Sequence, residues 1–270
     1  SATAFPPYPT PPQKTPMKKP AVPETATMST GKKLRLVWND EFDGRGLPDP
    51  AKWSYEEGFV RNREFQYYTR ERSANARREK GSLVLEARLD SLRHANGVAL
   101  CTSGSINTRG KASWKYGRFE IRAKLPGGIG AWPAIWMLGD NIPKVGWPRC
   151  GEIDIMEYVG HRKDQVHFTV HAQNEGRHVS KGVNVNFPTA ETDFAVYVLE
   201  WERDALRFFV DGTLGLEFKR GDIAIAPWPF DKPHYLLLNL AIGGSWGAEK
   251  GIDAAIFPCR FEIDYVRVYQ

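Results

Sequence analysis

Short runs in which apolar and polar residues alternate recur along most of the chain. In residues 118–124, Phe119, Ile121 and Ala123 alternate with Arg or Glu or Lys at every other position. A period of two residues places successive side chains on opposite faces of a β-strand. Turn signals separate such runs, for example Asp211-Gly212 between two apolar segments. No window of 12 or more residues shows a helical period, so the pattern predicts strands and turns.

This pattern predicts an all-β fold with more than ten strands, arranged as two antiparallel sheets packed face to face. A single sandwich of this kind fits a chain of 270 residues. We expect strands at residues 34–38, 65–69, 83–89, 105–108, 118–125, 152–158, 166–171, 194–201, 206–210, 235–242 and 261–269.

The N-terminal segment has a different composition from the rest of the chain. Residues 1–23 contain eight of the 19 prolines. Proline-rich segments of this kind form extended linkers. We therefore expect a linker over residues 1–30, a boundary near Gly31, and one domain over residues 31–270.

The charge is concentrated in the same segment. The formal net charge is +5, and residues 1–33 hold five lysines and one glutamate, which is +4. The remaining residues carry only about +1, so we expect no nucleic-acid partner. No run of about 18 apolar residues exists, which excludes a membrane-spanning helix.

Cysteine usage gives few constraints. The three cysteines, Cys101, Cys150 and Cys259, allow either one disulfide with one free thiol or three free thiols. Their spacing matches no zinc site. We expect Cys150 to be a small buried residue.

The most informative segment is the acidic strand at residues 152–157. Glu152 and Asp154 are two residues apart and share one face. Strict alternation would send Glu157 into the core, which is costly for a carboxylate. One extra residue, a β-bulge at Ile155-Met156, would return Glu157 to the face of the other two acids.

Three carboxyl groups on one strand face favour acid–base chemistry. Carboxyl groups held close together cannot all ionise easily, so the pKa of at least one of them rises. One ionised and one protonated carboxyl group are what glycoside hydrolysis requires. A simpler explanation is an ordinary solvent-facing strand that happens to carry acids.

Aromatic residues around this strand favour a sugar ligand. Trp132 and Trp136 precede it, and Trp147 lies five residues before Glu152. Aromatic faces stack on the apolar faces of sugars, although a single Trp is more often a core residue. His167 and His171 share a face of the next expected strand, where one could adjust the ionisation of the acids; we interpret His167 as a surface histidine.

Together these motifs resemble the bacterial laminarinases, endo-β-1,3-glucanases of glycoside hydrolase family 16. The resemblance extends from about residue 36 to residue 270 and includes the bulged form of the acidic motif. It rests on VWNDEFDG at 37–44, NREFQYYT at 62–69, YGRFEIRAKLPGG at 116–128, WPAIWML at 132–138, GWPRCGEIDIMEYVG at 146–160, RFFVDG at 207–212 and EIDYVRVYQ at 262–270.

The resemblance implies a jelly-roll sandwich with a concave substrate groove and a retaining double-displacement mechanism. Glu152 matches the nucleophile and Glu157 the general acid/base. Asp154 matches the acid that orients the nucleophile, and His171 a histidine beside the acid/base pair. No cofactor is implied for catalysis.

The resemblance also implies binding positions. The sugar-contacting residues would be Asn62, Trp132, Trp136, Trp147 and Trp246. A structural Ca²⁺ ion would lie away from the groove, bound by the carbonyl groups of Glu41 and Gly81 and by the side chain of Asp264. Oxygen ligands of this kind suit Ca²⁺.

Two departures from the family pattern fall near the sugar sites. The segment EEGFVRNREFQYYT lacks the Trp-Gly usual in laminarinases, and Ser105 stands where they commonly carry an Arg. These changes leave the acidic motif intact, and they bear on which glucan is preferred.

We therefore expect a secreted, cell-surface or periplasmic enzyme, active as a monomer, that cleaves internal β-1,3 bonds of laminarin-type or mixed-linkage glucans. A second hypothesis keeps the mechanism but acts on a marine galactan: agar, porphyran or carrageenan. Sulfated galactans would require cationic side chains in the groove, for which Arg61, Arg63, Arg149, Arg162 and Arg177 are available. Two functions without catalysis also fit the predicted sandwich, a glucan-binding module and a plain structural domain.

Overall fold

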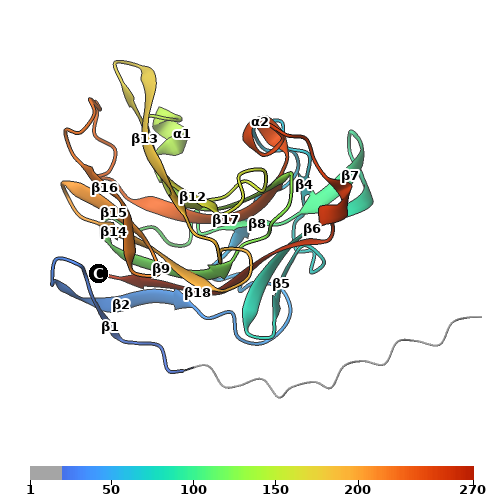
Figure 1. The fold of residues 1–270 in the computed structure, drawn as a ribbon, viewed down its shortest axis with the longest axis horizontal. Coiled ribbons are helices and arrows are strands. Elements are labelled where there is room, and N and C mark those ends of the chain that lie inside the picture. The colour runs from blue at the N-terminus through green and yellow to red at the C-terminus, as the bar shows by residue number, and fades with distance from the viewer. Residues whose placement is uncertain (1–19) are drawn as a thin grey trace, which may run out of the picture.

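Two stacked β-sheets make up the computed structural model, which describes residues 20–270 (Figure 1). The eleven-stranded sheet has the order β16-β15-β14-β9-β18-β6-β7-β4, with β1, β2 and β5 joined at its sides. The seven-stranded sheet has the order β13-β12-β11-β10-β17-β8-β3. The predicted all-β jelly-roll sandwich is confirmed.

The eleven-stranded sheet contains β1 (Thr25–Thr27), β2 (Lys33–Asp40), β4 (Tyr67–Tyr68), β5 (Ala76–Glu79), β6 (Ser82–His94), β7 (Gly97–Ser103), β9 (Gly117–Lys124), β14 (Ala195–Trp201), β15 (Ala205–Val210), β16 (Thr213–Lys219) and β18 (Cys259–Tyr269). The seven-stranded sheet contains β3 (Ser54–Tyr55), β8 (Ser105–Asn107), β10 (Ala131–Gly139), β11 (Glu152–Glu157), β12 (Gln165–Asn174), β13 (Arg177–Asn186) and β17 (His234–Ile242). Helices in the described part of the chain are restricted to α1 (Ile142–Val145), α2 (Gly244–Gly247) and a 3₁₀ turn at Ala254–Ile256.

The core lies between the two sheets and follows the alternation in the sequence. In β9, Phe119, Ile121 and Ala123 are fully buried, while the polar residues between them are partly exposed. They belong to one large apolar cluster that also receives Ile153 from β11 of the other sheet. Burial of one apolar face per sheet is what drives the two layers together.

Alternation alone missed seven strands: β1, β3, β5, β7, β10, β13 and β16. Strand β10 shows no alternation because all nine of its residues are buried. Strand β13 is mostly polar and exposed, so it carries little apolar signal. The sheets also contain one parallel pair, β4 with β7, where only antiparallel pairing was expected.

The folded region begins earlier than the boundary expected near Gly31. Strand β1 pairs with β2, and Met28 packs in a small buried cluster with Leu34 and Tyr269. The backbone N–H of Ser29 donates a hydrogen bond to Glu200 at 3.0 Å. Residues 20–30 therefore belong to the domain, and the remainder of the expected linker lies outside the described residues.

All three cysteines are free and buried, which agrees with three free thiols and excludes the disulfide. Burial raises the pKa of the Cys150 thiol to about 11, which makes it a poor nucleophile at neutral pH. Among residues 20–270, no helix is long and apolar enough to cross a membrane.

Candidate active site

The expected β-bulge is present in β11. On β10, Trp136 pairs with Asp154 and Ile135 pairs with Met156, so Ile155 is the extra residue. Ile155 and Met156 are both fully buried in the core between the sheets. The bulge absorbs one apolar residue and returns Glu157 to the face that carries Glu152 and Asp154.

These three acids line a groove of about 880 Å³ across the seven-stranded sheet. The lining side chains come from β13 and β12 at one edge, from β11, β10 and β17 in the middle, and from residues 56–62 at the other edge. The groove therefore crosses the strands and spans the width of the sheet.

The acids form one connected cluster with His171. The Nε2 atom of His171 lies 3.3 Å from Glu152 Oε2 and 3.1 Å from Asp154 Oδ2. The register of β11 and β12 explains this contact, because His171 pairs directly with Glu152. Asp154 lies between the two glutamates on β11, and the indole N–H of Trp147 donates to Glu152 Oε1 at 3.1 Å.

Burial and mutual repulsion raise the pKa values of all three acids. Burial, followed by the charge of Asp154, raises the pKa of Glu152 well above its ordinary value. Burial and the charge of Glu157 do the same for the pKa of Asp154. Burial, followed by the charge of Glu152, raises the pKa of Glu157 to about 8. The cluster therefore retains protons at neutral pH.

His167 is a groove residue and not the surface histidine that we expected. It pairs with Glu157 across β11 and β12, and its ring centre lies 4.8 Å from that of Trp246. Burial lowers its pKa to about 4, so it is neutral at pH 7. Trp132 completes this end of the groove by donating its indole N–H to Glu157 Oε1 at 3.3 Å and by packing edge-on against Trp246.

Two tryptophans beside the acidic strand differ in access. Trp147 is 49% exposed and forms part of the wall beside Glu152. Trp136 is only 8% exposed. Its indole N–H donates to Asn239 at 2.7 Å, and the guanidinium group of Arg61 lies 4.9 Å from its ring centre. Trp136 thus lines the groove with most of its surface covered.

Asn62 reaches the groove from a sharp turn. Asn62 and Arg63 both have positive φ angles, 55° and 54°, which reverse the chain locally. The Asn62 side chain donates to Glu64 at 3.0 Å. Burial raises the pKa of Glu64, which lies close enough to add to the negative charge near Glu157.

Only some of the arginines considered for a sulfated substrate line the groove. Arg61 and Arg162 do, and so does Arg109, which the sequence did not indicate. Arg61 is paired with Glu56, and Arg162 lies 3.3 Å from Glu249. The lining of the groove does not include Arg63, Arg149 or Arg177.

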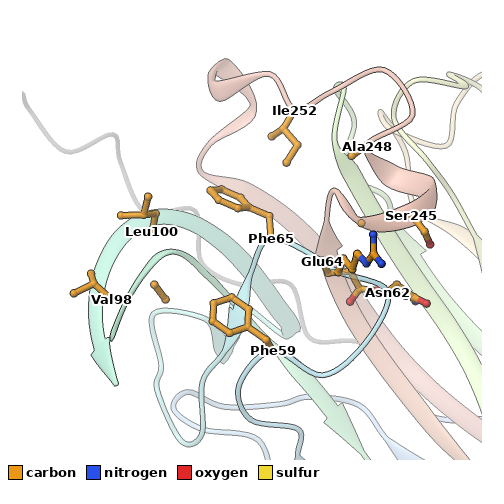
Figure 2. A pocket seen from close by; sticks show the side chains of 12 residues that line it. Phe59, Asn62, Glu64, Phe65, Val98, Leu100, Ser245, Ala248 and Ile252 are labelled. Carbon is orange, nitrogen blue, oxygen red and sulfur yellow. Dashed lines mark hydrogen bonds between the residues drawn. The ribbon is translucent and has the colours of Figure 1, made fainter. Parts of the chain in front are cut away.

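A second, apolar pocket lies next to the groove. Figure 2 shows Phe59 and Phe65 on the side that faces Val98 and Leu100, with Asn62 at the opposite side. Asn62 and Glu64 line both this pocket and the groove. The segment 59–65 therefore separates an apolar outer pocket from the polar groove.

The three positions expected to bind Ca²⁺ lie together at the edge of β18. Strands β2 and β6 both pair with β18, and their registers place Glu41 and Gly81 beside residues 264–265. This arrangement suits two carbonyl ligands and one carboxylate. The carboxylate of Asp264 accepts a hydrogen bond from Arg122 at 2.8 Å, so an ion there would share this carboxylate with a guanidinium group.

A β-sandwich with a groove, a row of three carboxyl groups and flanking tryptophans has the features of a polysaccharide-cleaving glycoside hydrolase. Residues 62–267 match the family model described as Glycosyl hydrolases family 16. The chain belongs to this family.

Similar proteins cover most of the chain. A beta-glucanase from Rhodothermus marinus is 48% identical over 246 residues, which is 87% of this chain and 85% of that protein. The structure of the laminarinase from Rhodothermus marinus has a TM-score of 0.80 and covers 88% of this chain and 97% of the other, at 48% identity. A keratan-sulfate endo-1,4-beta-galactosidase from Sphingobacterium multivorum is 37% identical over 87% of this chain, which spans 55% of that protein.

Proposed function

We propose that the protein is an endo-acting, retaining β-glucanase that hydrolyses internal β-1,3 bonds of laminarin-type glucans and accepts mixed-linkage glucans. The observation that carries this proposal is the cluster of Glu152, Asp154 and Glu157, which line the groove from one strand, with His171 beside the first two. The names of its relatives, a beta-glucanase and a laminarinase, support the substrate class.

In the first step, Glu157 protonates the glycosidic oxygen while the carboxylate of Glu152 attacks the anomeric carbon. The C–O bond to the leaving sugar breaks, and a covalent glycosyl–Glu152 intermediate forms. In the second step, Glu157 removes a proton from water, which attacks the anomeric carbon and releases Glu152. Two inversions at one carbon give net retention.

The contacts around the acids support this division of roles. Glu152 accepts a hydrogen bond from the indole N–H of Trp147 and lies 3.3 Å from Nε2 of His171. Glu157 has one indole donor, from Trp132. Glu157, with a pKa of about 8, holds its proton at neutral pH and can act as the acid. Glu152 has His171 beside it, whose charge partly offsets the rise in the Glu152 pKa. The charge of Glu152 acts on the pKa of Glu157, which supports the short separation of carboxyl groups that a retaining mechanism requires.

The shape of the groove supports internal cleavage. Since it spans the sheet from β13 to residues 56–62, a polymer can lie across the acids with sugars on both sides. A polymeric substrate of this kind is met outside the cell, and one chain supplies a complete site, so we propose a secreted or cell-surface monomer.

The decisive experiment follows reducing ends and product sizes during incubation with laminarin, with Glu152→Gln as the control. We expect short oligosaccharides from the wild-type enzyme and none from the variant. Proton NMR of the first product should show the β-anomer before mutarotation. Tight laminarin binding without turnover would instead indicate a non-catalytic binding module.

A second candidate substrate is a galactose-containing polymer. The 37% identical relative named a keratan-sulfate endo-1,4-beta-galactosidase favours it, as does Arg109 in the groove. Release of reducing ends from keratan sulfate or agarose, with none from laminarin, would favour this candidate.

We also propose a structural Ca²⁺ ion bound by the carbonyl groups of Glu41 and Gly81 and by Asp264, with no part in the chemistry. The registers of β2 and β6 on β18 support it. Calcium should raise the melting temperature relative to EDTA, and Asp264→Asn should remove that increase. Equal melting temperatures for the wild-type protein with calcium and with EDTA would rule the site out.

A further inference from the structure

We propose that Arg61, held by Glu56 against the face of Trp136, is a specificity-determining residue that binds hydroxyl groups of a sugar next to the cleavage point. This inference rests on the proposed function of the groove and adds the feature that selects among polymers. It assigns to Arg61 a role that its sequence position alone does not indicate.

The loop that carries Arg61 is fixed in place. The backbone N–H of Ser245 donates to the carbonyl of Asn62 at 2.9 Å, and that of Phe65 donates to the carbonyl of Ile242 at 2.8 Å. Both contacts tie the loop to the end of β17 and to α2. The guanidinium group therefore extends into the groove from a loop that is anchored at the sheet.

Glu56 then fixes the guanidinium group itself. Arg61 donates from Nη1 to Glu56 Oε1 at 3.0 Å and from Nη2 to Glu56 Oε2, so the pair is bidentate. The hydroxyl of Ser105 donates to the same Oε1 at 2.7 Å. Both side chains are largely shielded from solvent, at 25% and 15% exposed. A bidentate pair of this kind has one orientation and no net charge.

Trp136 provides the surface against which Arg61 lies. With the guanidinium 4.9 Å from the ring centre and the indole 8% exposed, the face of the ring is occupied. Stacking on an open indole would accept any flat sugar face. The N–H groups of Arg61 that Glu56 does not use, fixed beside a carboxylate, can bind hydroxyl groups and discriminate among their orientations.

The pair lies on one side of the cleavage point only. Trp136 pairs with Asp154 on β11 and with Leu237 on β17, whereas His171 contacts the acids from β12, on the opposite side. Arg61 therefore contacts the sugar on the β17 side of the cleavage point. It does not contact the reacting carboxyl groups, so its effect should be on binding and selection.

The chain offers a matched control for this contact. Arg220 lies 5.1 Å from the ring centre of Trp228, and Trp228 is also 8% exposed. Neither residue lines the groove. Arg220→Met removes the same kind of cation–ring contact as Arg61→Met, but away from any sugar.

The experiment measures kcat and KM for Arg61→Met, Arg61→Lys and Arg220→Met on laminarin oligosaccharides, mixed-linkage glucan and a neutral galactan. For Arg61→Met we expect KM on the preferred polymer to rise roughly 10- to 100-fold, the loss of one hydrogen bond to a charged group, with kcat within about threefold. Its preference between gluco- and galacto-configured polymers should fall by about tenfold. Arg61→Lys should recover only part of the loss, and Arg220→Met should match wild type.

Calorimetric binding of the same oligosaccharides on a Glu152→Gln background keeps the test independent of turnover. Weaker binding to the Arg61→Met form supports the role of Arg61 even if the reaction assigned to the groove is wrong. An unchanged KM and affinity in Arg61→Met would overturn the proposal. A lower KM in that variant would also overturn it, because Arg61 would then obstruct Trp136.

Discussion

Two buried carboxyl groups, one in each sheet, have pKa values that are shifted in opposite directions. Glu86 on β6 is 0% exposed and Asp154 on β11 is 1% exposed. Burial alone would raise both pKa values. The pKa of Glu86 is nevertheless lowered by hydrogen bonds and charge from Arg88, Arg260 and Arg77, which lie 2.6, 2.7 and 3.2 Å away. The pKa of Asp154 is raised, because its neighbours are carboxyl groups.

The difference between the two clusters lies in the cationic partners of their buried acids. On the eleven-stranded sheet, the buried carboxylate of Glu86 is paired with guanidinium groups. These partners neutralise its charge, so the cluster has a structural role. At Asp154, Glu152 and Glu157 the only cationic candidate within 4 Å among the described residues is His171. Omitting arginine keeps protons on the acids, which suits acid catalysis and costs stability.

The largest effect should come from removing the proton donor. Glu157→Gln should lower kcat on laminarin by about 10²- to 10⁴-fold, the usual contribution of a general acid. In the wild-type enzyme, kcat/KM should fall as the pH rises through about 8, where Glu157 loses its proton. The variant should lose that alkaline limb. A wild-type profile that stays flat to pH 10 would contradict the assignment.

An arginine placed beside the groove acids should remove the difference in pKa shift between the two clusters. Thr169 on β12 pairs with Asp154 on β11 and lines the groove. Thr169→Arg should lower the pKa values of the acids, reduce activity at pH 7 by roughly 10- to 100-fold, and shift the alkaline limb to lower pH. Thr169→Gln controls for size, and it should leave the limb in place. If both variants lose activity without a shift, the cause is steric.

Breaking the structural cluster should affect stability and leave the chemistry unchanged. Glu86→Gln removes the shared partner of three arginines and should destabilise the fold by roughly 2–4 kcal/mol, which is less than a fully buried pair because the arginines are partly exposed. Denaturant unfolding measures this, and kcat of the folded variant should equal wild type. Because the folded pKa of Glu86 is lowered, this stabilisation is present above its unfolded pKa and is lost as pH falls through its folded pKa.

The smallest predicted effect is a gain in stability when Glu157 is replaced. Glu157 binds its proton more tightly when folded, so the fold loses stability as pH rises from about 4.5, the ordinary value, to about 8. Glu157→Gln removes this loss, and its melting temperature should exceed wild type at pH 8. At pH 4 the two should agree. A variant less stable than wild type at pH 8 would show that Glu157 is not strained by its neighbours.

The acidic strand could be predicted because its information is local. Spacing places Glu152 and Asp154 on one face, and the cost of burying Glu157 indicates the bulge that the structure contains. His167 was misplaced, although its spacing of four from His171 already implied a shared face. The Arg61 contacts could not be predicted, since they join Glu56, Ser105 and Trp136 from separate parts of the chain. Strands with uniform burial, such as β10, carry no alternation to detect.

The position of β1 has a practical consequence for handling the protein. This strand lies on the eleven-stranded sheet, whereas the groove lies on the seven-stranded sheet, and Figure 1 shows the C-terminus beside β2. A bead, an electrode or a fusion partner attached at the β1 end would therefore be attached on the side of the eleven-stranded sheet, away from the groove. Immobilised in this orientation, the enzyme would face an insoluble polysaccharide film with its groove unobstructed.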